Sequence, residues 1–378
     1  MIDIISWIKL EEVLSMGKKV YIYAYTEMNL GDDLFIKILC ERYPNERFYV
    51  MAKPKNSSAF RQIKNLTTIP KIPWIDGVLA KLKIHMGINN QLQKIISIFC
   101  DVIVCIGGSL FIQNKNWENK INQFQNSILN NKPFFVLGSN FGPYTNENFF
   151  HRFNTIFSDI TDICFREENS YQLFSNLTNV RKESDIVFTY KMNHKIIEKD
   201  NIVISVINLK ERYSIAKYEN MYIEKIIDIV NFFLENNFSV TLMGFCSAEG
   251  DTEVINSILE NKILAGRAGL YKYIYNGDID KALNVLQESK YIVGSRFHAM
   301  ILGWLFNKIV YPIVYSEKSL NVMNDIGFKG PYANIKYIDQ LDIETDYKKL
   351  MESSKISIEK EIESANRQFV KLDELLLS

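Results

Sequence analysis

The chain has 378 residues, of which 47% are hydrophobic, 23% charged and 13% aromatic, with 8 Pro and 17 Gly. This composition excludes disordered, collagen-like and low-complexity proteins, and the length predicts about two domains. Lys and Arg together number 44, as do Asp and Glu. A nucleic-acid partner is therefore not expected, because it would require surplus cations to neutralise phosphates. Any positive potential should be local and lie in a cleft.

The cysteines and the longest apolar segments indicate a cytoplasmic protein. The five cysteines lie mostly among apolar residues, and none forms a CxxC pair or a Cys–His ligand pair. We expect reduced, buried thiols and no metal site. The N-terminal segment carries Asp3, Lys9 and two Glu, which argues against a signal peptide. No apolar stretch approaches the ~18 residues that a membrane span needs.

The first half of the chain alternates short apolar strands with amphipathic helices. The strands are continuous apolar runs, as expected for strands covered on both faces, so the pattern predicts βαβ units and a mostly parallel sheet. The predicted strands are Lys19–Tyr25, Arg47–Ala52, Asp101–Ile106, Pro133–Gly138 and Asp162–Arg166. The predicted helices are Leu34–Tyr43, Ile75–Cys100, Trp117–Asn130 and Asn148–Ser158.

A polar stretch over residues 190–200 interrupts this pattern, which then restarts. The predicted strands of the second half are Ile202–Val206, Ser239–Gly244, Tyr291–Val293 and Ile309–Val314. Its predicted helices are Tyr218–Glu235, Glu253–Leu259, Ile279–Gln287 and Ala299–Phe306. We therefore predict an α/β protein with two Rossmann-like, doubly wound domains, 1–189 and 201–340, joined by a linker over 190–200. Ligands of such sheets bind beyond the carboxyl ends of the strands, so the site should lie in a cleft between the domains.

Residues 341–378 are predicted to contain one amphipathic helix, from Ile356 to Leu376. Apolar residues recur at positions 358, 362, 365, 369, 372 and 376, and the other faces are rich in Glu and Lys. This stripe should pack on an apolar surface. Two alternatives stay open: the surface belongs to the protein's own domains, or to a second copy in a homo-oligomer.

Small or polar residues end several strands of the first half, at the edge where a ligand would bind. Glycine there permits tight turns and close approach of backbone N–H groups to a ligand, and Asp can cap the next helix. Arg166 is either an anion clamp or the partner of Glu167 or Glu168. The turns are Asn29-Leu-Gly-Asp32-Asp33, Gly107-Gly108-Ser109, Gly138-Ser-Asn140-Phe-Gly-Pro143 and Arg166-Glu-Glu-Asn-Ser170.

The strongest signal is the turn Gly294-Ser295-Arg296-Phe297-His298, which ends a strand and opens a helix. Helix N-termini attract anions, and the Arg296 guanidinium adds a bidentate fork for phosphate or carboxylate. The His298 imidazole can transfer protons near neutral pH. A lone His is often structural, but Arg296 in the same turn favours a functional role. Lys318 follows the next strand and should bring an ammonium to the same edge.

Taken together, these motifs resemble those of the polysaccharide pyruvyltransferase family. The resemblance covers residues 19–330 and rests on segments that occur in the family's order: Asn29-Leu-Gly-Asp-Asp33, Gly107-Gly-Ser109, Gly138-Ser-Asn-Phe-Gly-Pro143, Arg166-Glu-Glu-Asn-Ser170, Ser184-Asp-Ile-Val-Phe188, Ser295-Arg-Phe-His-Ala299 and Tyr315-Ser-Glu-Lys318. The chain departs from the family at Ser109, Ser139 and Phe297, where Gly, Gln and Leu are usual. The resemblance implies a glycosyltransferase-B-like fold.

The resemblance also implies a reaction. The pyruvyl group of phosphoenolpyruvate would move to two hydroxyls of a sugar in a bacterial cell-surface polysaccharide precursor, giving a cyclic ketal and free phosphate. Phosphoenolpyruvate is then a co-substrate, and no cofactor is implied. Its charge leads us to expect that Arg166, Arg296 and Lys318 bind its phosphate and carboxylate, with His298 as general acid or base. These four are the predicted catalytic residues.

The remaining predicted site residues divide between donor and acceptor. Ser295 and Phe297 complete the donor-binding segment of the second domain. The first domain should bind the acceptor sugar through residues at its strand ends, and Asp32 or Asp33 could serve as a second base. The predicted acceptor-binding residues are Asn29, Asp32, Asp33, Gly107, Gly108, Ser109 and Asn140.

Two other functions are compatible with the same motifs. A glycosyltransferase of this fold would hold the diphosphate of a nucleotide sugar at the same helix N-terminus, and an inactive scaffold would bind neither substrate. The acceptor could be lipid-linked at the inner face of the membrane. Trp74–Phe99, with Lys81, Lys83 and Lys94 among apolar residues, is then a candidate for peripheral membrane contact, and packing on the first domain is its alternative.

Overall fold

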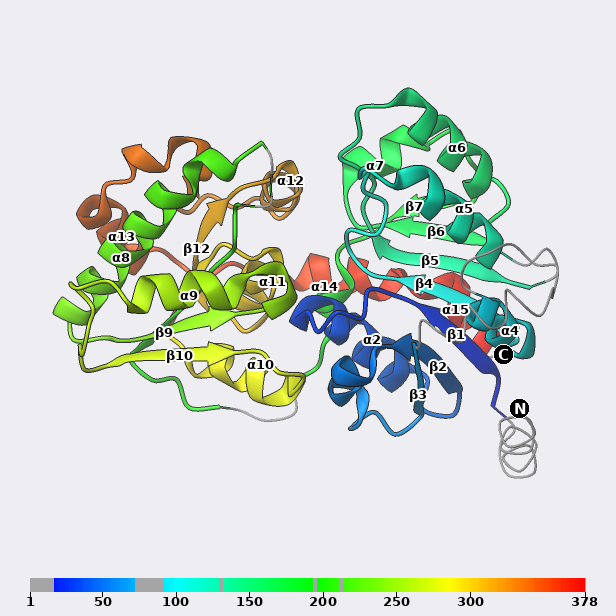
Figure 1. Ribbon diagram of the computed structural model, residues 1–378, viewed down its shortest axis with the longest axis horizontal. Helices are drawn as coiled ribbons and strands as arrows, with labels where there is room; N and C mark the ends of the chain where they lie inside the picture. Colours follow the sequence, from blue (N-terminus) through cyan, green and yellow to red (C-terminus); the bar gives the residue numbers. More distant parts are fainter. Residues whose placement is uncertain are drawn as a thin grey trace.

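The computed structural model describes residues 17–71, 91–128, 132–192, 196–210, 212 and 214–377. They form two α/β domains that lie next to each other along the longest axis of the molecule (Figure 1). Every strand pairing within the two sheets is parallel. The predicted fold class is confirmed.

The strand order of the two sheets explains where a ligand can bind. The first sheet has the order β3 (Leu66–Pro70), β2 (Arg47–Ala52), β1 (Lys19–Tyr23), β4 (Val102–Ile106), β5 (Phe134–Ser139), β6 (Asp162–Phe165) and β7 (Val180–Lys182). The second has the order β10 (Leu270–Ile274), β9 (Ser239–Gly244), β8 (Asn201–Ser205), β11 (Tyr291–Gly294), β12 (Ile309–Val314) and β13 (Ala333–Asn334). The order reverses between β1 and β4 and between β8 and β11. Such switch points leave a crevice at the carboxyl ends of the strands.

Helices connect successive strands in both domains. Those of the first domain are α2 (Leu30–Arg42), α4 (Gln91–Phe99), α5 (Trp117–Ser127), α6 (Glu147–Phe157) and α7 (Glu168–Leu173). Those of the second are α8 (Glu219–Glu235), α9 (Asp251–Leu259), α10 (Ile279–Glu288), α11 (Phe297–Leu305) and α12 (Glu317–Asp325), and α13 (Ile343–Glu352) follows its last strand. Two further helices, α14 (Glu359–Arg367) and α15 (Val370–Leu376), end the described chain.

Apolar side chains cover both faces of the central strands. In β4, Val104 packs in one core cluster with Phe35 of α2, whereas Cys105 packs in another with Phe124 of α5. Strands buried on both faces read as continuous apolar runs, which is why the sequence pattern identified them. All five cysteines are buried and unpaired, as predicted.

One core cluster is shared between the domains beneath the cleft. It joins Leu34 and Phe35 of α2 to Tyr275, Ile279 and Met300 of the second domain. Nearby, the backbone N–H of Leu30 donates to the carbonyl of Phe245 across the interface, at 3.1 Å. The start of α2 is therefore held against the second domain. This contact fixes where the residues at the N-terminal end of α2 lie relative to that domain.

The sequence pattern missed four strands, and all four lie at sheet edges. These strands, β3, β7, β10 and β13, are short or largely accessible, so they lack the continuous apolar run of a central strand. The described residues of the predicted linker, 190–192 and 196–200, contain neither helix nor strand.

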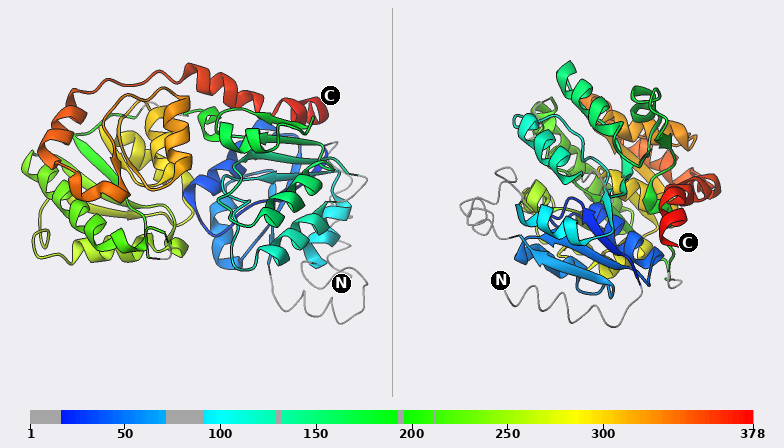
Figure 2. Two further views of the ribbon diagram at one scale, coloured as in Figure 1. Left: turned by 90° about the horizontal axis from the view of Figure 1, so that it is seen from above. Right: turned by 90° about the vertical axis from the view of Figure 1, so that its right-hand side faces the viewer.

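The prediction of a single C-terminal helix is wrong. Residues 341–377 form three helices, and the predicted helix over 356–376 breaks at Gln368 and Phe369 into α14 and α15. The first of the three, α13, packs on the second domain, whereas α14 and α15 cross to the first domain and lie along it (Figure 2). Arg42 of α2 donates to Asp373 of α15 through Nε at 2.9 Å and Nη2 at 2.6 Å. The apolar stripe thus packs on the protein's own domains.

Most of the segment considered for membrane contact, Trp74–Phe99, lies outside the described residues, namely its residues 74–90. The remainder forms α4, on which Ile98 and Phe99 are exposed. None of the helices that the structure describes has the length and apolar character that a bilayer crossing requires.

The packing of α15 on the first domain gives a testable prediction about stability. Phe369 is 0% exposed, and the Arg42 guanidinium lies 4.6 Å from its ring centroid. We expect Phe369→Ala to lower the free energy of unfolding by about 3–5 kcal/mol, because the cavity adds to the lost transfer energy. Its neighbour Val370 is 41% exposed, so Val370→Ala should cost less than about 1 kcal/mol. Urea unfolding followed by circular dichroism measures both, and equal costs would contradict the packing described.

Candidate active site

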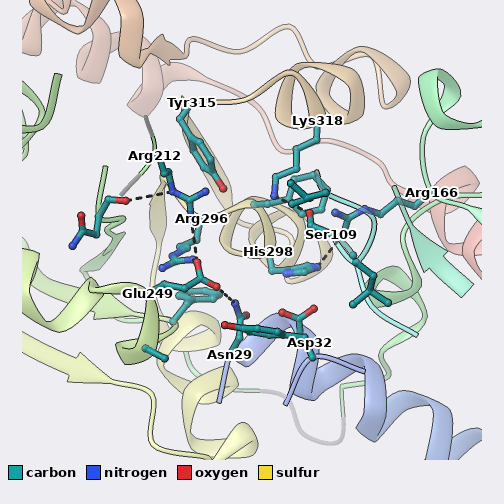
Figure 3. Close-up of a pocket in the computed structure, with 18 of the residues that line it drawn as sticks. Asn29, Asp32, Ser109, Arg166, Arg212, Glu249, Arg296, His298, Tyr315 and Lys318 are labelled. Carbon is teal, nitrogen blue, oxygen red and sulfur yellow. Dashed lines mark hydrogen bonds and ion pairs between the residues drawn. The ribbon is translucent and has the colours of Figure 1, made fainter. Parts of the chain in front are cut away.

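A cavity of about 610 Å³ lies between the domains, where the carboxyl ends of the central strands of both sheets meet (Figure 3). Both polar and apolar side chains line it, and they come from both domains. The lining residues are Tyr25, Asn29, Asp32, Gly108, Ser109, Leu110, Ile112, Asn114, Arg166, Asn208, Arg212, Phe245, Ala248, Glu249, Arg296, Phe297, His298, Tyr315 and Lys318.

The start of α2 brings one carboxylate into the cavity and turns its neighbour away. Asn29 caps the helix, with its side chain accepting from the N–H of Gly31 at 3.1 Å. Asp32 lines the cavity. Asp33 is fully buried on another face of α2, where it accepts a hydrogen bond from the Tyr275 hydroxyl at 2.8 Å. The prediction that Asp33 binds the acceptor is therefore wrong, because successive helical residues point about 100° apart.

Arg166 follows β6 and is held in place by first-domain groups. Its Nη1 donates to Asp185 at 2.8 Å and its Nη2 to the Asn140 side chain at 2.7 Å. A Cβ on Gly108 would lie 2.6 Å from Nη1 of Arg166, so a larger residue there would displace the guanidinium. The carboxylate partner of Arg166 is thus Asp185 and not Glu167 or Glu168, whereas the alternative role of Arg166 as an anion clamp stays a prediction. The guanidinium also lies 4.3 Å from the ring centroid of Phe297, which belongs to the second domain.

His298 in the first turn of α11 reaches the first domain. Its Nε2 lies 3.5 Å from Nη1 of Arg166 and 3.8 Å from Oδ2 of Asp185. The ring packs edge-on against Phe35 of α2. Gly31 is the residue that makes this approach possible, because a Cβ on it would lie only 1.8 Å from Nδ1 of His298.

Asp185 is a buried anion that supports both of these groups. Burial disfavours its ionised form, but the neighbouring His298 imidazole and the Arg166 charge outweigh burial and lower its pKa to about 2. Its other oxygen accepts from the N–H of Val187 and caps the short turn Ile186–Thr189. Asp185 was part of a sequence motif but was assigned no role; its place behind Arg166 and His298 makes it the residue that orients both.

Arg296 was expected to offer its fork to an anionic ligand, but the structure uses that fork within the protein. Its Nε donates to Oδ2 of Asp251 at 3.1 Å, and its Nη2 donates to Oδ1 of the same carboxylate. Nη1 donates to Glu249 at 2.5 Å. Arg296 lines the cavity with a side chain that is only 7% exposed. It is therefore a positioning residue for Glu249 rather than a free anion clamp.

Lys318 brings the expected ammonium to the cavity from the start of α12. Its Nζ lies 3.4 Å from Oγ of Ser109 across the cleft and 5.5 Å from the ring centroid of Phe297. Among the residues that the structure describes, no carboxylate forms an ion pair with Lys318. Its charge is thus available to a ligand.

Three further predicted site residues lie behind the cavity surface. Gly107 has a φ of +146°, which favours glycine, and its carbonyl accepts from the Ser139 hydroxyl. Asn140 is buried and orients Arg166 and Ser109. Ser295 is buried, and its hydroxyl accepts from that of Tyr222 at 2.9 Å. These residues shape the site without lining it, in contrast to the prediction that they bind the acceptor or the donor.

The lining residues that sequence reasoning missed include Arg212, Glu249 and Tyr315. Arg212 lies in the loop that follows β8, Glu249 ends the short 3-10 helix Ser247–Glu249 after β9, and Tyr315 directly follows β12. Because those strand ends were predicted correctly, the position of each loop was a usable signal. Tyr315 was quoted within a motif, but no role was assigned to it.

The charged groups in and directly behind the cavity are balanced. The cations are Arg166, Arg212, Arg296 and Lys318, and the carboxylates are Asp32, Asp185, Glu249 and Asp251. The cavity therefore does not have the local surplus of cationic side chains that the sequence led us to expect. An anion would have to compete with carboxylates for most of these cations. Within the described ranges, no three His, Cys, Asp or Glu side chains converge as a metal ion would require.

The sequence of this chain is similar to those of known proteins. A family model described as polysaccharide pyruvyl transferase matches residues 29–317. The amylovoran biosynthesis protein AmsJ of Erwinia amylovora is 22% identical over 264 residues, which cover 62% of this chain and 62% of AmsJ. The match thus spans less than two thirds of the length of that relative.

Solved structures with the same fold cover nearly the whole chain. HepE of Anabaena in complex with UDP and glucose has a TM-score of 0.55 at 10% identity, with 96% of this chain and 98% of HepE covered. The UDP-GlcNAc 2-epimerase of Neisseria meningitidis bound to UDP-GlcNAc has a TM-score of 0.59 at 10% identity, with 96% and 100% covered. The class of fold is therefore the glycosyltransferase-B type, with two Rossmann-like domains around a cleft.

Within that class, the family match runs through the same strand ends that line the cavity. Because the family model matches most of the chain, this protein belongs to the polysaccharide pyruvyl transferase family.

The contact between Gly31 and His298 gives a prediction about stability. Alanine normally stabilises a helix by about 1 kcal/mol relative to glycine, but here its Cβ would overlap the imidazole. We expect Gly31→Ala to lower the free energy of unfolding by about 1–3 kcal/mol. In a His298→Ala background the same substitution should be neutral or stabilising. Urea unfolding of the four proteins tests this, and an equal cost in both backgrounds would show that the ring is not the obstacle.

The low pKa of Asp185 gives a prediction about pH dependence. Its pKa is about 2 in the folded protein and about 3.9 in an unfolded chain, so its stabilising effect is present above that unfolded value and is lost as pH falls toward 2. As the pH is lowered from about 5 to about 3, we expect the free energy of unfolding of the wild type to fall by about 1 kcal/mol more than that of Asp185→Asn. The control Glu118→Gln, at an exposed position on α5, should follow the wild type. Urea unfolding across this range measures the difference, and parallel curves for all three proteins would refute it.

Proposed function

We propose that the protein transfers the pyruvyl group of phosphoenolpyruvate to two hydroxyls of a sugar, forming a cyclic ketal and releasing phosphate. The observation that carries this proposal is the meeting of Arg166, His298 and Lys318 in one cavity, from two domains. They supply two cations for a small anion and one group for proton transfer. Membership of the polysaccharide pyruvyl transferase family supports the same reaction.

The donor would bind over the Phe297 ring. Arg166 and Lys318 both lie near that ring, with distances of 4.3 Å and 5.5 Å to its centroid. Hydrogen bonds to charged groups contribute about 1.5–3 kcal/mol each, so two cations provide useful affinity for a phosphate and a carboxylate. Arg296 acts indirectly, by holding Glu249 in the wall of the cavity.

The proton balance of the reaction assigns roles to His298 and Asp32. Ketal formation adds two hydroxyl oxygens to the carbon that bears the phosphate; each hydroxyl loses a proton, the methylene carbon gains one, and the other leaves with the phosphate. In this proposal His298 transfers the proton to or from the reacting atoms. Asp32 lines the same cavity. Burial raises the pKa of its carboxyl group, and this effect outweighs the neighbouring His298, which lowers the pKa. It would receive a hydroxyl proton or orient the acceptor, together with Asn29.

The acceptor would be a sugar of a bacterial surface-polysaccharide precursor, handled in the cytoplasm. The family description and the assignment of AmsJ to amylovoran biosynthesis support this class of substrate. A nucleotide sugar is the competing donor, because solved structures with the same fold contain UDP. At such low identity, those structures support only the fold. The family match, by contrast, favours the pyruvyl donor.

The test measures phosphate release from phosphoenolpyruvate with a panel of hexose acceptors. We expect His298→Gln to lower kcat by about 10²–10⁴-fold, as for loss of a general acid or base, with a much smaller change in KM for phosphoenolpyruvate. The matched control is His151→Gln, at an exposed position on α6, which should leave kcat unchanged.

Two results would count against the proposal. Near-normal turnover by His298→Gln would remove His298 from the proton-transfer role. Failure of the wild type to bind phosphoenolpyruvate in calorimetry, combined with binding of UDP-glucose, would replace the pyruvyl donor by a nucleotide sugar.

A further inference from the structure

The arginine best placed to meet a ligand from the second domain is Arg212. It lies in the loop after β8, the central strand at the switch point of the second sheet. Its side chain is 33% exposed, compared with 3% for Arg166 and 7% for Arg296. Accessible N–H groups on a cavity wall are what an incoming anion requires.

The backbone of Arg212 itself is held by hydrogen bonds to neighbouring residues. The N–H of Arg212 donates to the carbonyl of Leu209, and its own carbonyl accepts from Ile215 at 2.8 Å and Ala216 at 2.9 Å. The N–H of Leu209 in turn donates to the buried carboxylate of Glu219 at 2.7 Å. Arg212 is therefore presented to the cavity from a defined position.

The guanidinium of Arg212 is oriented by Tyr315 and shares one carboxylate with Arg296. It lies 4.9 Å from the Tyr315 ring centroid, and its Nη2 donates to Oε2 of Glu249 at 3.1 Å. The same oxygen accepts from Arg296 at the shorter distance of 2.5 Å. Glu249 can therefore remain with Arg296 while an anion takes its place beside Arg212.

The Tyr315 hydroxyl points into this end of the cavity, near cationic side chains (Figure 3). Burial disfavours ionisation of the phenol, yet the charges of Lys318, Arg212 and Arg296 outweigh burial and lower its pKa. Lys318 lies on the same ring, with Nζ 5.8 Å from the centroid. Two cations thus flank Tyr315: within the described ranges Lys318 forms no ion pair with a carboxylate, and Arg212 shares Glu249 with Arg296.

We propose that Arg212 binds a phosphate group of a substrate, with Tyr315 as its orienting partner and Glu249 as the counter-ion that this phosphate displaces. The planar guanidinium suits phosphate oxygens because it can donate two parallel hydrogen bonds. The inference deepens the proposed function and rests on it only in treating this cavity as the active site.

Two sources could supply that phosphate. One is phosphoenolpyruvate itself. The other is a phosphate or diphosphate on the acceptor sugar: the cavity of about 610 Å³ is in the size range of sites for drug-sized ligands, so it has room for an acceptor beside a three-carbon donor.

The experiment uses calorimetry with two probes, phosphoenolpyruvate alone and inorganic pyrophosphate added to the protein saturated with phosphoenolpyruvate. We expect Arg212→Gln to weaken binding of at least one probe tenfold or more. Arg212→Lys should weaken it less, because the positive charge remains while the bidentate guanidinium is lost.

Glu249→Gln should tighten the same probe severalfold, because the competing anion is removed; a merely structural role for Arg212 would not predict this. The matched control is Lys210→Gln, an exposed lysine in the same loop, which should change neither affinity by more than twofold. Thermal unfolding without ligand verifies that each variant is folded.

The pattern of losses identifies the source. Weaker phosphoenolpyruvate binding assigns Arg212 to the donor, and weaker pyrophosphate binding with phosphoenolpyruvate unchanged assigns it to an acceptor phosphate. If the wild type binds pyrophosphate but not phosphoenolpyruvate, and Arg212→Gln loses that binding, the phosphate site stands and the pyruvyl donor does not. Unchanged affinities for both probes in Arg212→Gln, or no binding of either probe by the wild type, would overturn the proposal.

Discussion

The contact of His298 with the first domain is the constraint on which the site depends. The imidazole belongs to the second domain, but it lies against Gly31, Arg166 and Asp185 of the first. The shared apolar cluster below the cleft holds α2 and α11 at this separation. The imidazole of one domain and the guanidinium of the other are brought together because the two sheets face each other at their switch points, where the strand ends leave room.

The charged groups of the cavity are mostly paired with one another. Burying unpaired cations would be costly, so the arginines are held by carboxylates: Arg166 by Asp185, and Arg296 by Asp251. These pairs position the side chains and neutralise most of their charge. Of the four cations, Lys318 and Arg212 are the least engaged by carboxylates among the described residues.

The sequence determined the fold class, the central strands and the turns that contribute to the site. Continuous apolar runs identify β1, β4, β5, β8 and β11 because these strands are buried on both faces, whereas the edge strands β3, β7, β10 and β13 carry no such run. The polar turns after the central strands follow from the same pattern. Arg166, His298 and Lys318 were predicted on this basis, and all three line the cavity.

Only the tertiary structure decided which of these charged groups remain available. Arg296 meets Asp251, and Arg212 meets Glu249, across separations in sequence of 45 and 37 residues that no local pattern relates. Asp32 and Asp33 are adjacent in sequence, yet the rotation of α2 places one in the cavity and the other against Tyr275. The periodicity of apolar residues predicts burial, because burial depends on which face of a single helix or strand a residue occupies. The pairing of charged side chains depends on how several elements are placed in space, and only the packing of those elements decides it.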